Sequence, residues 1–281
     1  MKIIDAHVHY SKIASFEECA RHTSIVDYSE SGYLKETADN EVVQTICMGL
    51  VETSRGGFPD KAAQMPMVAD LAESMPPGMS LCLGINPHSL SDNSLAKTED
   101  LLNNCVNIVG MKIYAGYYHI DILDPVYTPV YMLAEKYDKT IVIHTGETFS
   151  SRGLLKYCHP LLIDDLAVAH PDIRLVACHM GTPWVFDACE IAAKNPNVYI
   201  DLSGILVGNS DFLAKQTEIP QVVDRYKQAL MFLNNYDKVI YGTDWPLVPM
   251  GAYIDFCKKL IPAEHHEKVF FENAMTVFKL L

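Results

Sequence analysis

The feature that most constrains the fold is a repeated alternation of short β-rich runs and helical patterns along the whole chain. The runs occupy residues 2–9, 44–51, 79–86, 108–114, 139–146, 173–181, 197–204 and 238–246. Helical patterns are clearest at 60–75, 128–138, 161–170, 184–195 and 220–235. Strands that are apolar along most of their length and are separated by helices predict a parallel sheet covered on both faces.

Eight strand–helix units in 281 residues predict an α/β protein of the (β/α)8 TIM-barrel type. A doubly wound open sheet is the alternative, but it usually has fewer strands, and the chain lacks the glycine-rich turn of dinucleotide-binding folds. Because no linker or low-complexity segment interrupts the pattern, we expect one domain over 1–281. We expect the longest connection, 10–43, to hold a helix and a loop over the active face.

The composition bounds the possible partners. The formal charge of −13 and the sequence pI of about 5.2 argue against binding to nucleic acid or to anionic membranes. No stretch approaches the roughly 18 apolar residues of a membrane span, and the first residues do not resemble a signal peptide. We therefore expect a cytoplasmic protein that binds a small molecule, with a homodimer as the default assembly. The eight scattered cysteines are expected to be reduced and mostly buried.

Polar side chains recur where the apolar runs end. They are His7, His9, Lys112, His144, His179 and Asp244. In a barrel, the carboxyl ends of the strands meet at one mouth, where barrel enzymes build their active sites. Imidazole nitrogens and a carboxylate suit zinc and similar divalent ions. The set therefore predicts a divalent-metal site at the mouth.

Six motifs that span the chain resemble those of a known family. They are DAHVH (5–9), GMKIY (110–114), VIHTGE (142–147), ACHMG (177–181), YGTDWP (241–246) and FENAMTVF (271–278). The chain resembles the amidohydrolase superfamily of metal-dependent barrel hydrolases, and in particular its amidohydrolase 2 branch. That branch also includes enzymes like aminocarboxymuconate semialdehyde decarboxylase and resorcylate decarboxylase.

The resemblance implies a mononuclear metal site with His7, His9, His144 and Asp244 as ligands. It places His179 near the metal-bound water or the substrate, so that Asp244 and His179 are the expected catalytic residues. The expected ion is Zn²⁺, with Mn²⁺ or another divalent ion as the alternative.

Lys112 is open to three interpretations. In binuclear relatives, a carboxylated lysine on the fourth strand bridges two ions, and His144 and His179 would then bind the second ion. Alternatively, the Lys112 ammonium faces the substrate or water, or it forms a structural ion pair with Asp201 or Glu147.

Other residues are expected around this centre. Asp5 has the strand parity of His7 and His9 and is a candidate acceptor for the second nitrogen of a ligating imidazole. Arg55 and Arg152 lie in glycine-containing loops and, with Lys112, suit the recognition of an acidic substrate. The remaining candidates for the substrate site are His119 and Tyr114, which follow and end the fourth run.

The expected reaction is hydrolysis of a small amide, lactone or ester, either neutral or acidic, by a metal-activated water. Non-oxidative decarboxylation of a small carboxylic acid is the alternative, although recognised decarboxylases of the branch tend to be longer than this chain. A barrel that only binds its ligand is a third class, but it would be expected to lack a metal ligand, and none is lacking in the sequence.

Overall fold

The computed structural model describes residues 1–280, and within them eight parallel strands follow one another around a single sheet. They are β1 (Ile3–Val8), β2 (Val42–Met48), β3 (Met79–Ile85), β4 (Ile108–Ile113), β5 (Thr140–Ile143), β6 (Leu175–Ala177), β7 (Val198–Asp201) and β8 (Val239–Ile240). Each strand pairs with the next in the chain, as successive right-handed strand–helix units require.

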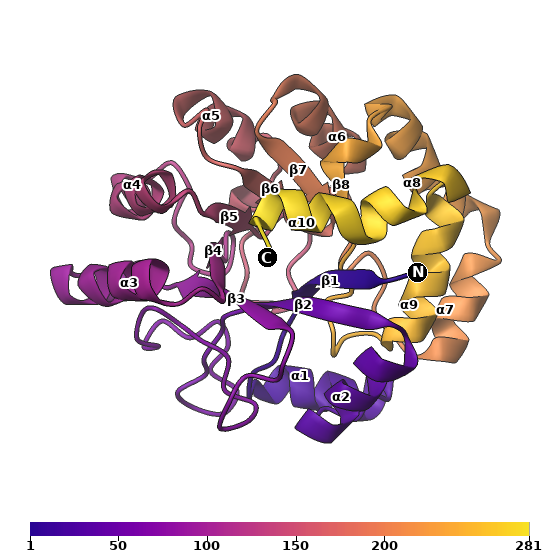
Figure 1. Ribbon diagram of the computed structural model, residues 1–281, viewed down its shortest axis with the longest axis horizontal. Helices are drawn as coiled ribbons and strands as arrows, with labels where there is room; N and C mark the ends of the chain where they lie inside the picture. Colours follow the sequence, from indigo (N-terminus) through magenta and orange to yellow (C-terminus); the bar gives the residue numbers. More distant parts are fainter. Residues whose placement is uncertain (281) are drawn as a thin grey trace.

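The first and last strands lie side by side and bring the sheet close to a full circle. Ala6 N donates to Tyr241 O at 3.0 Å, and His9 N donates to Trp245 O at 2.7 Å. A further bond of 2.8 Å runs from the amide of Asp244 to the carbonyl oxygen of His7. The predicted (β/α)8 barrel is therefore confirmed (Figure 1).

Helices surround the barrel (Figure 1). They are α1 (Ala14–Cys19), α2 (Glu30–Asp39), α3 (Asp92–Asn104), α4 (Thr128–Tyr137), α5 (Leu162–Ala169), α6 (Val185–Lys194), α7 (Ser210–Thr217), α8 (Pro220–Leu233), α9 (Met250–Leu260) and α10 (Asn273–Phe278). Short helical turns are η1 (Ala20–Ser24), η2 (Pro87–Ser89), η3 (Pro125–Tyr127), η4 (Leu155–Tyr157), η5 (Cys178–Gly181), η6 (Tyr236–Lys238), η7 (Ala263–His265) and η8 (Lys268–Glu272). Four of the five predicted helices are confirmed as α4, α5, α6 and α8, and the long connection 10–43 holds α1 and α2.

The predicted helix at 60–75 is wrong. This segment is an extended loop in which Met67 and Gly84 exchange two backbone hydrogen bonds of 2.9 Å. Pro66 has no N–H for a helix, and the side-chain amide of Asn86 binds the carbonyl oxygen of Ala63 at 2.7 Å. The helix of this βα unit is α3, whose start is fixed by a capping box between Ser91 and Ser94.

Two strands are shorter than their apolar runs. β6 ends at Ala177 and β8 at Ile240, whereas the runs continue to 181 and 246. Beyond each strand, a polar residue takes a left-handed backbone conformation, with φ of 60° at His179 and 71° at Asp244. The chain thus leaves the sheet early and turns these side chains toward the barrel mouth.

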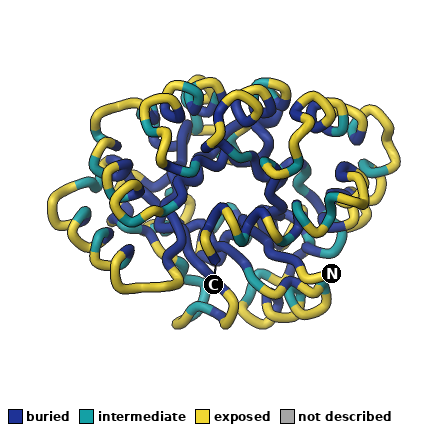
Figure 2. The backbone as a smooth tube through the Cα atoms, turned by 45° about the horizontal axis from the view of Figure 1, so that its top comes forward, coloured by how far each residue is buried: buried dark blue, intermediate teal, exposed yellow. Residues whose placement is uncertain are grey.

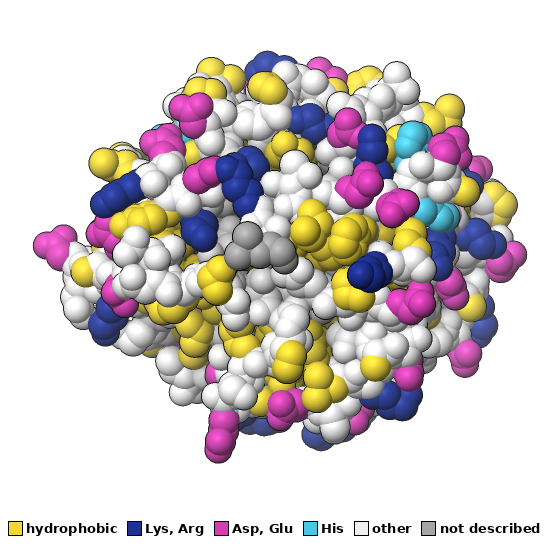
Figure 3. Space-filling model, in the orientation of Figure 1, with side chains coloured by type: hydrophobic (Ala, Val, Ile, Leu, Met, Phe, Trp, Pro, Cys, Tyr) yellow, Lys and Arg dark blue, Asp and Glu magenta, His cyan; other side chains and the backbone are white. Residues whose placement is uncertain are grey.

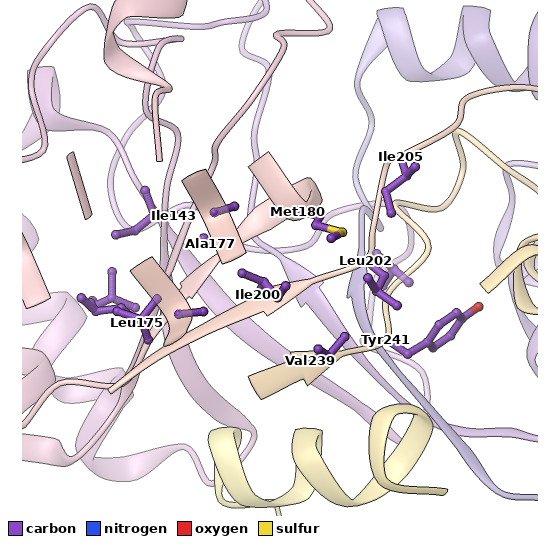
Figure 4. Packing of buried hydrophobic residues seen from close by; sticks show 14 of the residues in the cluster. Ile143, Leu175, Ala177, Met180, Ile200, Leu202, Ile205, Val239 and Tyr241 are labelled. Carbon is purple, nitrogen blue, oxygen red and sulfur yellow. The ribbon is translucent and has the colours of Figure 1, made fainter. Parts of the chain in front are cut away.

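The strands are buried, whereas exposed residues lie on the outer helices and loops (Figure 2). Buried hydrophobic side chains form an inner layer inside the barrel and an outer layer between the sheet and the helices, and a third cluster includes Phe16, Phe58 and Tyr117. Alternate residues of a strand enter different layers. Val176 packs inside the barrel, whereas Leu175 and Ala177, which Figure 4 labels, pack outside it. The inner layer includes Val277 and Phe278 of α10, so this helix covers the end of the barrel opposite the mouth.

Acidic and basic side chains are interspersed on the face seen in Figure 3. All eight cysteines are free, and seven of them are buried, Cys105 being exposed. Within residues 1–280, no helix combines the length and the apolar character that crossing a membrane requires.

Candidate active site

A cavity of about 310 Å³ opens at the carboxyl ends of the strands. Its imidazole and charged side chains combine the residues predicted from the strand ends with one acid from the loop after β5. These are His7, His9, Lys112, His144, Glu147, His179 and Asp244. Apart from Glu147, all of these side chains are buried. The structure therefore brings together the imidazoles and the carboxylate that the sequence predicted to converge.

His7, His9 and Asp244 form one tight group. Oδ1 of Asp244 lies 3.4 Å from Nε2 of His7 and 3.1 Å from Nε2 of His9. One potential ligand atom from each of the three residues lies within 4.8 Å of the other two. Nε2 of His7 and Oδ1 of Asp244 are buried without a hydrogen-bond partner among the described residues. Since buried polar atoms are normally satisfied, these orphaned atoms fit a divalent ion as their missing partner.

The protonation states of this group suit the same ion. Burial opposes ionisation of Asp244, but the neighbouring His179 and the nearby ring of His9 lower the pKa of its carboxyl below the ordinary value. Burial also lowers the pKa of His9. The site thus presents a carboxylate and a neutral imidazole, which are the forms that bind metals.

His144 and His179 form a second group beside the first. Nδ1 of His144 lies 3.1 Å from Nε2 of His179. The other nitrogen of each ring faces a backbone carbonyl oxygen, that of Glu147 for His144 and that of Ser203 for His179, both at 3.1 Å. Carbonyl oxygens only accept, so in neutral rings the two N–H groups point outward and two lone pairs face each other. This arrangement also favours a cation between the rings and the first group.

Burial keeps both of these rings neutral. It lowers the pKa of His179 to about 4, and together with the neighbouring His179 it holds the pKa of His144 well below its usual range. His144 lies outside the tight group of His7, His9 and Asp244, and it lines the same cavity. Its expected role as a ligand stays a prediction.

Asp5 does not accept a hydrogen bond from an imidazole within residues 1–280, which corrects the expectation from strand parity. Its carboxylate binds the backbone N–H of His7 at 3.2 Å and both the N–H and the hydroxyl of Thr243, at 2.9 and 2.6 Å. Burial raises the pKa of Asp5 to about 7. The carboxylate that contacts the His7 ring belongs instead to Asp201, whose Oδ2 lies 2.9 Å from Nδ1 of His7.

Lys112 has no carboxylate at ion-pair distance in the described part of the chain, so the structural pair with Asp201 or Glu147 is not formed. Its Nζ lies 2.8 Å from Sγ of Cys178 and 5.6 Å from the ring centre of Tyr114. Tyr114 lines the cavity and is oriented by a hydrogen bond of 2.8 Å from its hydroxyl to the carbonyl oxygen of Gly49.

The two arginines and His119 do not line the cavity, which corrects their expected contact with the substrate. The exposed Arg55 pairs with Glu17 at 3.0 Å. The guanidinium of Arg152 donates to the carbonyl oxygens of Gly56 and Phe58, and the Arg152 carbonyl in turn contacts Nε2 of His119 at 2.7 Å. The contacts of these residues connect loops with one another and with α1. Within residues 1–280, Lys112 is the cation that reaches the cavity.

The phenylalanines in the apolar wall of the cavity were not predicted. The wall comes from α1 and from the loops after β2, β4 and β5, and its rings are those of Phe16, Phe58, Tyr117 and Phe149. Ring-centre distances of 5.0–5.7 Å join them into one aromatic cluster, and Phe16 also lies 4.9 Å from His9. Isolated phenylalanines carry no sequence signal for such a role.

Gly204 is a second feature that sequence reasoning missed. At its φ of 59°, a Cβ atom would lie 2.7 Å from Nδ1 of His179 and 2.9 Å from Oδ2 of Asp244. Only glycine leaves room for both side chains and adopts this backbone conformation without strain. The sequence signal that could have identified Gly204 is its position after the seventh strand, in DLSG.

An eight-stranded parallel barrel with a polar cavity at the carboxyl ends of its strands defines a TIM-barrel protein of the enzyme type. Within that class, the chain belongs to the Amidohydro_2 family of amidohydrolases, whose model matches residues 4–280. This confirms the resemblance carried by the six motifs. A search of curated proteins found no significant match.

Solved structures share the fold at low sequence identity. An uncharacterized TIM-barrel protein from Bordetella bronchiseptica is 18% identical, with a TM-score of 0.70 over 99% of both chains. A probable 2-pyrone-4,6-dicarboxylic acid hydrolase from Acinetobacter baumannii, with citric acid bound, is 15% identical, with a TM-score of 0.65 over 100% of both chains. The 5-carboxyvanillate decarboxylase of Novosphingobium aromaticivorans, complexed with manganese and 4-hydroxy-3-methoxy-5-nitrobenzoic acid, is 13% identical, with a TM-score of 0.61 over 99% of this chain and 96% of that one.

Proposed function

We propose that the protein is a metal-dependent hydrolase that attacks the carbonyl of a small amide, lactone or ester. The observation that carries the proposal is the group of His7, His9 and Asp244, in which Nε2 of His7 and Oδ1 of Asp244 are buried without hydrogen-bond partners within residues 1–280. His144, which lines the same cavity, completes the proposed ligand set. The ion is Zn²⁺ or Mn²⁺, and the manganese in the related decarboxylase structure supports considering both.

When bound, a divalent ion would polarise the substrate carbonyl and lower the pKa of a water molecule beside it. The chain's own contribution is proton transfer. The Asp244 carboxylate, kept ionised by its histidine neighbours, accepts the proton of the attacking water and later delivers it to the leaving group. His179 has Nε2 turned toward His144 and the cavity, so its lone pair is placed to orient or deprotonate the same water.

The remaining lining binds and shields the substrate. The aromatic cluster of Phe16, Phe58, Tyr117 and Phe149 excludes water from one side of the cavity. The Lys112 ammonium is the proposed partner for an acidic group of the substrate, and its lack of a carboxylate partner within residues 1–280 supports this role.

Decarboxylation of a small carboxylic acid is the second candidate. The observation that favours it is that Lys112 and the aromatic cluster line the same cavity, because such a cavity can hold the ring and the carboxylate of one compact acid. A decarboxylase of the same fold supports this alternative. In both reactions Asp244 and His179 would handle the proton, which is delivered to a leaving group in one and to carbon in the other.

The test begins with protein stripped of metal by a chelator and reloaded with zinc or manganese. A panel of lactones, esters and amides, each in a neutral and an acidic form, is assayed for hydrolysis. Matching carboxylic acids are assayed for release of carbon dioxide. Metal-dependent hydrolysis is expected. Carbon dioxide release alone would establish the second candidate, and turnover that persists in metal-free protein would overturn both.

A further inference from the structure

The carboxylate of Asp201 is the centre of a buried hydrogen-bond network beneath the cavity. Its Oδ1 accepts the backbone N–H groups of His179 at 2.8 Å and Ser203 at 3.0 Å, and the Ser203 hydroxyl at 2.5 Å. Its Oδ2 faces Nδ1 of His7 at 2.9 Å. Burial opposes ionisation of Asp201, but the neighbouring His7 keeps the pKa of this carboxyl below its ordinary value.

These contacts determine where the hydrogen of the His7 ring lies. An ionised carboxylate only accepts hydrogen bonds, so Nδ1 of His7 has to donate to Oδ2 of Asp201. A neutral imidazole carries one N–H, which leaves Nε2 with a lone pair. That atom is buried, has no hydrogen-bond partner among the described residues and lies 3.4 Å from Oδ1 of Asp244.

The same carboxylate acts on His179 through Ser203. The single hydroxyl hydrogen of Ser203 is taken by Oδ1 of Asp201, so the hydroxyl oxygen is left to accept. It lies 2.9 Å from Nδ1 of His179 and 3.0 Å from Nδ1 of His7. Together with the Ser203 carbonyl oxygen, it holds the hydrogen of His179 on Nδ1 and leaves Nε2 free toward the cavity.

We propose that Asp201 is a positioning residue that fixes the tautomer of His7, and with Ser203 that of His179, so that both rings present an unprotonated Nε2 to the cavity. The consequence for metal binding rests on the proposed function, because it takes His7 as a ligand. The tautomers themselves are a property of the metal-free chain.

Replacement of Asp201 by asparagine should change the tautomer of His7 but not that of His179. Two backbone N–H groups point at the Oδ1 position, so the amide oxygen of the new side chain has to stay there. Its NH2 group then faces Nδ1 of His7 and demands an acceptor, which forces the hydrogen of that ring onto Nε2. His179 keeps its tautomer, because the atom facing Ser203 is still an oxygen.

The experiment uses the full metal-free chain with isotope-labelled histidine at about pH 8, which lies above the ordinary pKa of a free imidazole. Long-range proton–nitrogen NMR spectra report which nitrogen of each ring is protonated, with His7→Gln and His179→Gln assigning the signals. We expect both rings of the unmodified protein to be protonated at Nδ1. In Asp201→Asn, the His7 signal should change to the Nε2-protonated pattern while His179 is unchanged.

Zinc affinity, measured with zinc chloride against a chromophoric chelator, is the second measurement. Asp201→Asn should weaken it by about 10- to 100-fold. The matched control is Asp60→Asn, which alters a buried carboxylate that accepts backbone N–H groups of Thr53 and Ala62 away from the imidazoles. Ser203→Ala leaves the Asp201–His7 contact in place, so the His7 tautomer should not change and zinc affinity should stay within about threefold.

Three outcomes would overturn the proposal. They are an Nε2-protonated His7 in the unmodified protein, an unchanged His7 ring in Asp201→Asn, and a loss of zinc affinity no larger than that of Asp60→Asn. If Asp201→Asn does not fold, the spectra of the unmodified protein and of Ser203→Ala decide. If the unmodified protein binds no zinc, the proposed function fails, whereas the tautomers still decide the role of Asp201.

Discussion

The ammonium nitrogen of Lys112 lies 2.8 Å from the sulfur of Cys178, and both side chains are buried in the barrel. A thiol is a weak acceptor and does not neutralise the charge. A buried charge without an ionic partner is unfavourable for folding, so its presence at the wall of the cavity is better explained by a ligand than by stability.

We expect Lys112→Met to separate these two roles. Methionine is of similar length and removes the buried charge, so the melting temperature should be unchanged or higher. For an acidic substrate, kcat/KM should fall by about 10-fold more than for its neutral analogue, because the ion pair with the ammonium is lost. Lys139→Met is the control, since Lys139 donates to the carbonyl oxygen of Ile108 at 2.6 Å outside the cavity. Equal losses for both substrates would contradict a role in recognising the acid.

The contact between Lys112 and Cys178 also predicts the metal content. Because Nζ is held against the thiol, we expect an unmodified lysine and one divalent ion per chain. Plasma emission should give a ratio near one, and intact mass spectrometry should show no carboxylated lysine. Two ions per chain with an added carbon dioxide on Lys112 would establish the binuclear site instead.

Gly204→Ala should impair the site more than the fold. The new Cβ would lie within 3.0 Å of both His179 and Asp244, and displacements of about 1 Å at such residues can lower kcat by about 10²-fold. Gly56→Ala is the matched control, because Gly56 has a similar φ of 75° with no atom within 4 Å of the added Cβ. Both variants should lose about 1 kcal/mol of unfolding free energy in chemical denaturation. Equal activities of the two would show that the room left by Gly204 is not needed.

Replacement of Arg55 and of Arg152 by alanine should affect stability and kinetics differently. The Arg55–Glu17 pair is exposed, so Arg55→Ala should change the unfolding free energy by less than about 0.5 kcal/mol and leave the kinetics near those of the unmodified enzyme. Arg152→Ala frees the backbone that carries Phe58 and should raise KM about equally for neutral and acidic substrates. A loss confined to acidic substrates would restore Arg152 as a substrate ligand.

Asp244→Ala should abolish turnover without unfolding the barrel. The variant loses both a proposed metal ligand and the proposed proton acceptor, and loss of acid–base catalysis alone corresponds to about 10²- to 10⁴-fold in kcat. Circular dichroism checks the fold and a kinetic assay checks the rate. Unchanged turnover would remove Asp244 from the mechanism.

The sequence was sufficient to predict convergence at the mouth. Five polar residues each lie at the end of an apolar run, namely His7, His9, His144, His179 and Asp244. The barrel geometry brings such ends together regardless of the conformations of the loops. The fold followed from the same alternation. The helix at 60–75 failed because proline and the contacts of Asn86 override a pattern that is helical only in its apolar spacing.

Contacts between segments that are far apart in the chain could not be predicted from the sequence. Strand parity favoured Asp5 as the partner of His7, but the pairing of β1 with β2 shifts register between Asp5 and Val8, and the alternation is interrupted there. The actual partner, Asp201, is 194 residues away in the chain. Arg152 was misplaced for a similar reason, since no sequence pattern indicates that a guanidinium will bind the backbone of another loop.

The left-handed backbones of His179 and Asp244 have a consequence for engineering. Each costs about 1 kcal/mol of folding free energy relative to a residue that adopts this conformation readily. The active site therefore includes two residues in backbone conformations that are unfavourable for their side chains. Glycine or asparagine at either position would relax the backbone and remove the chemistry. Directed evolution for heat resistance alone would therefore tend to erase the active site first, and a useful screen has to select for turnover in every round.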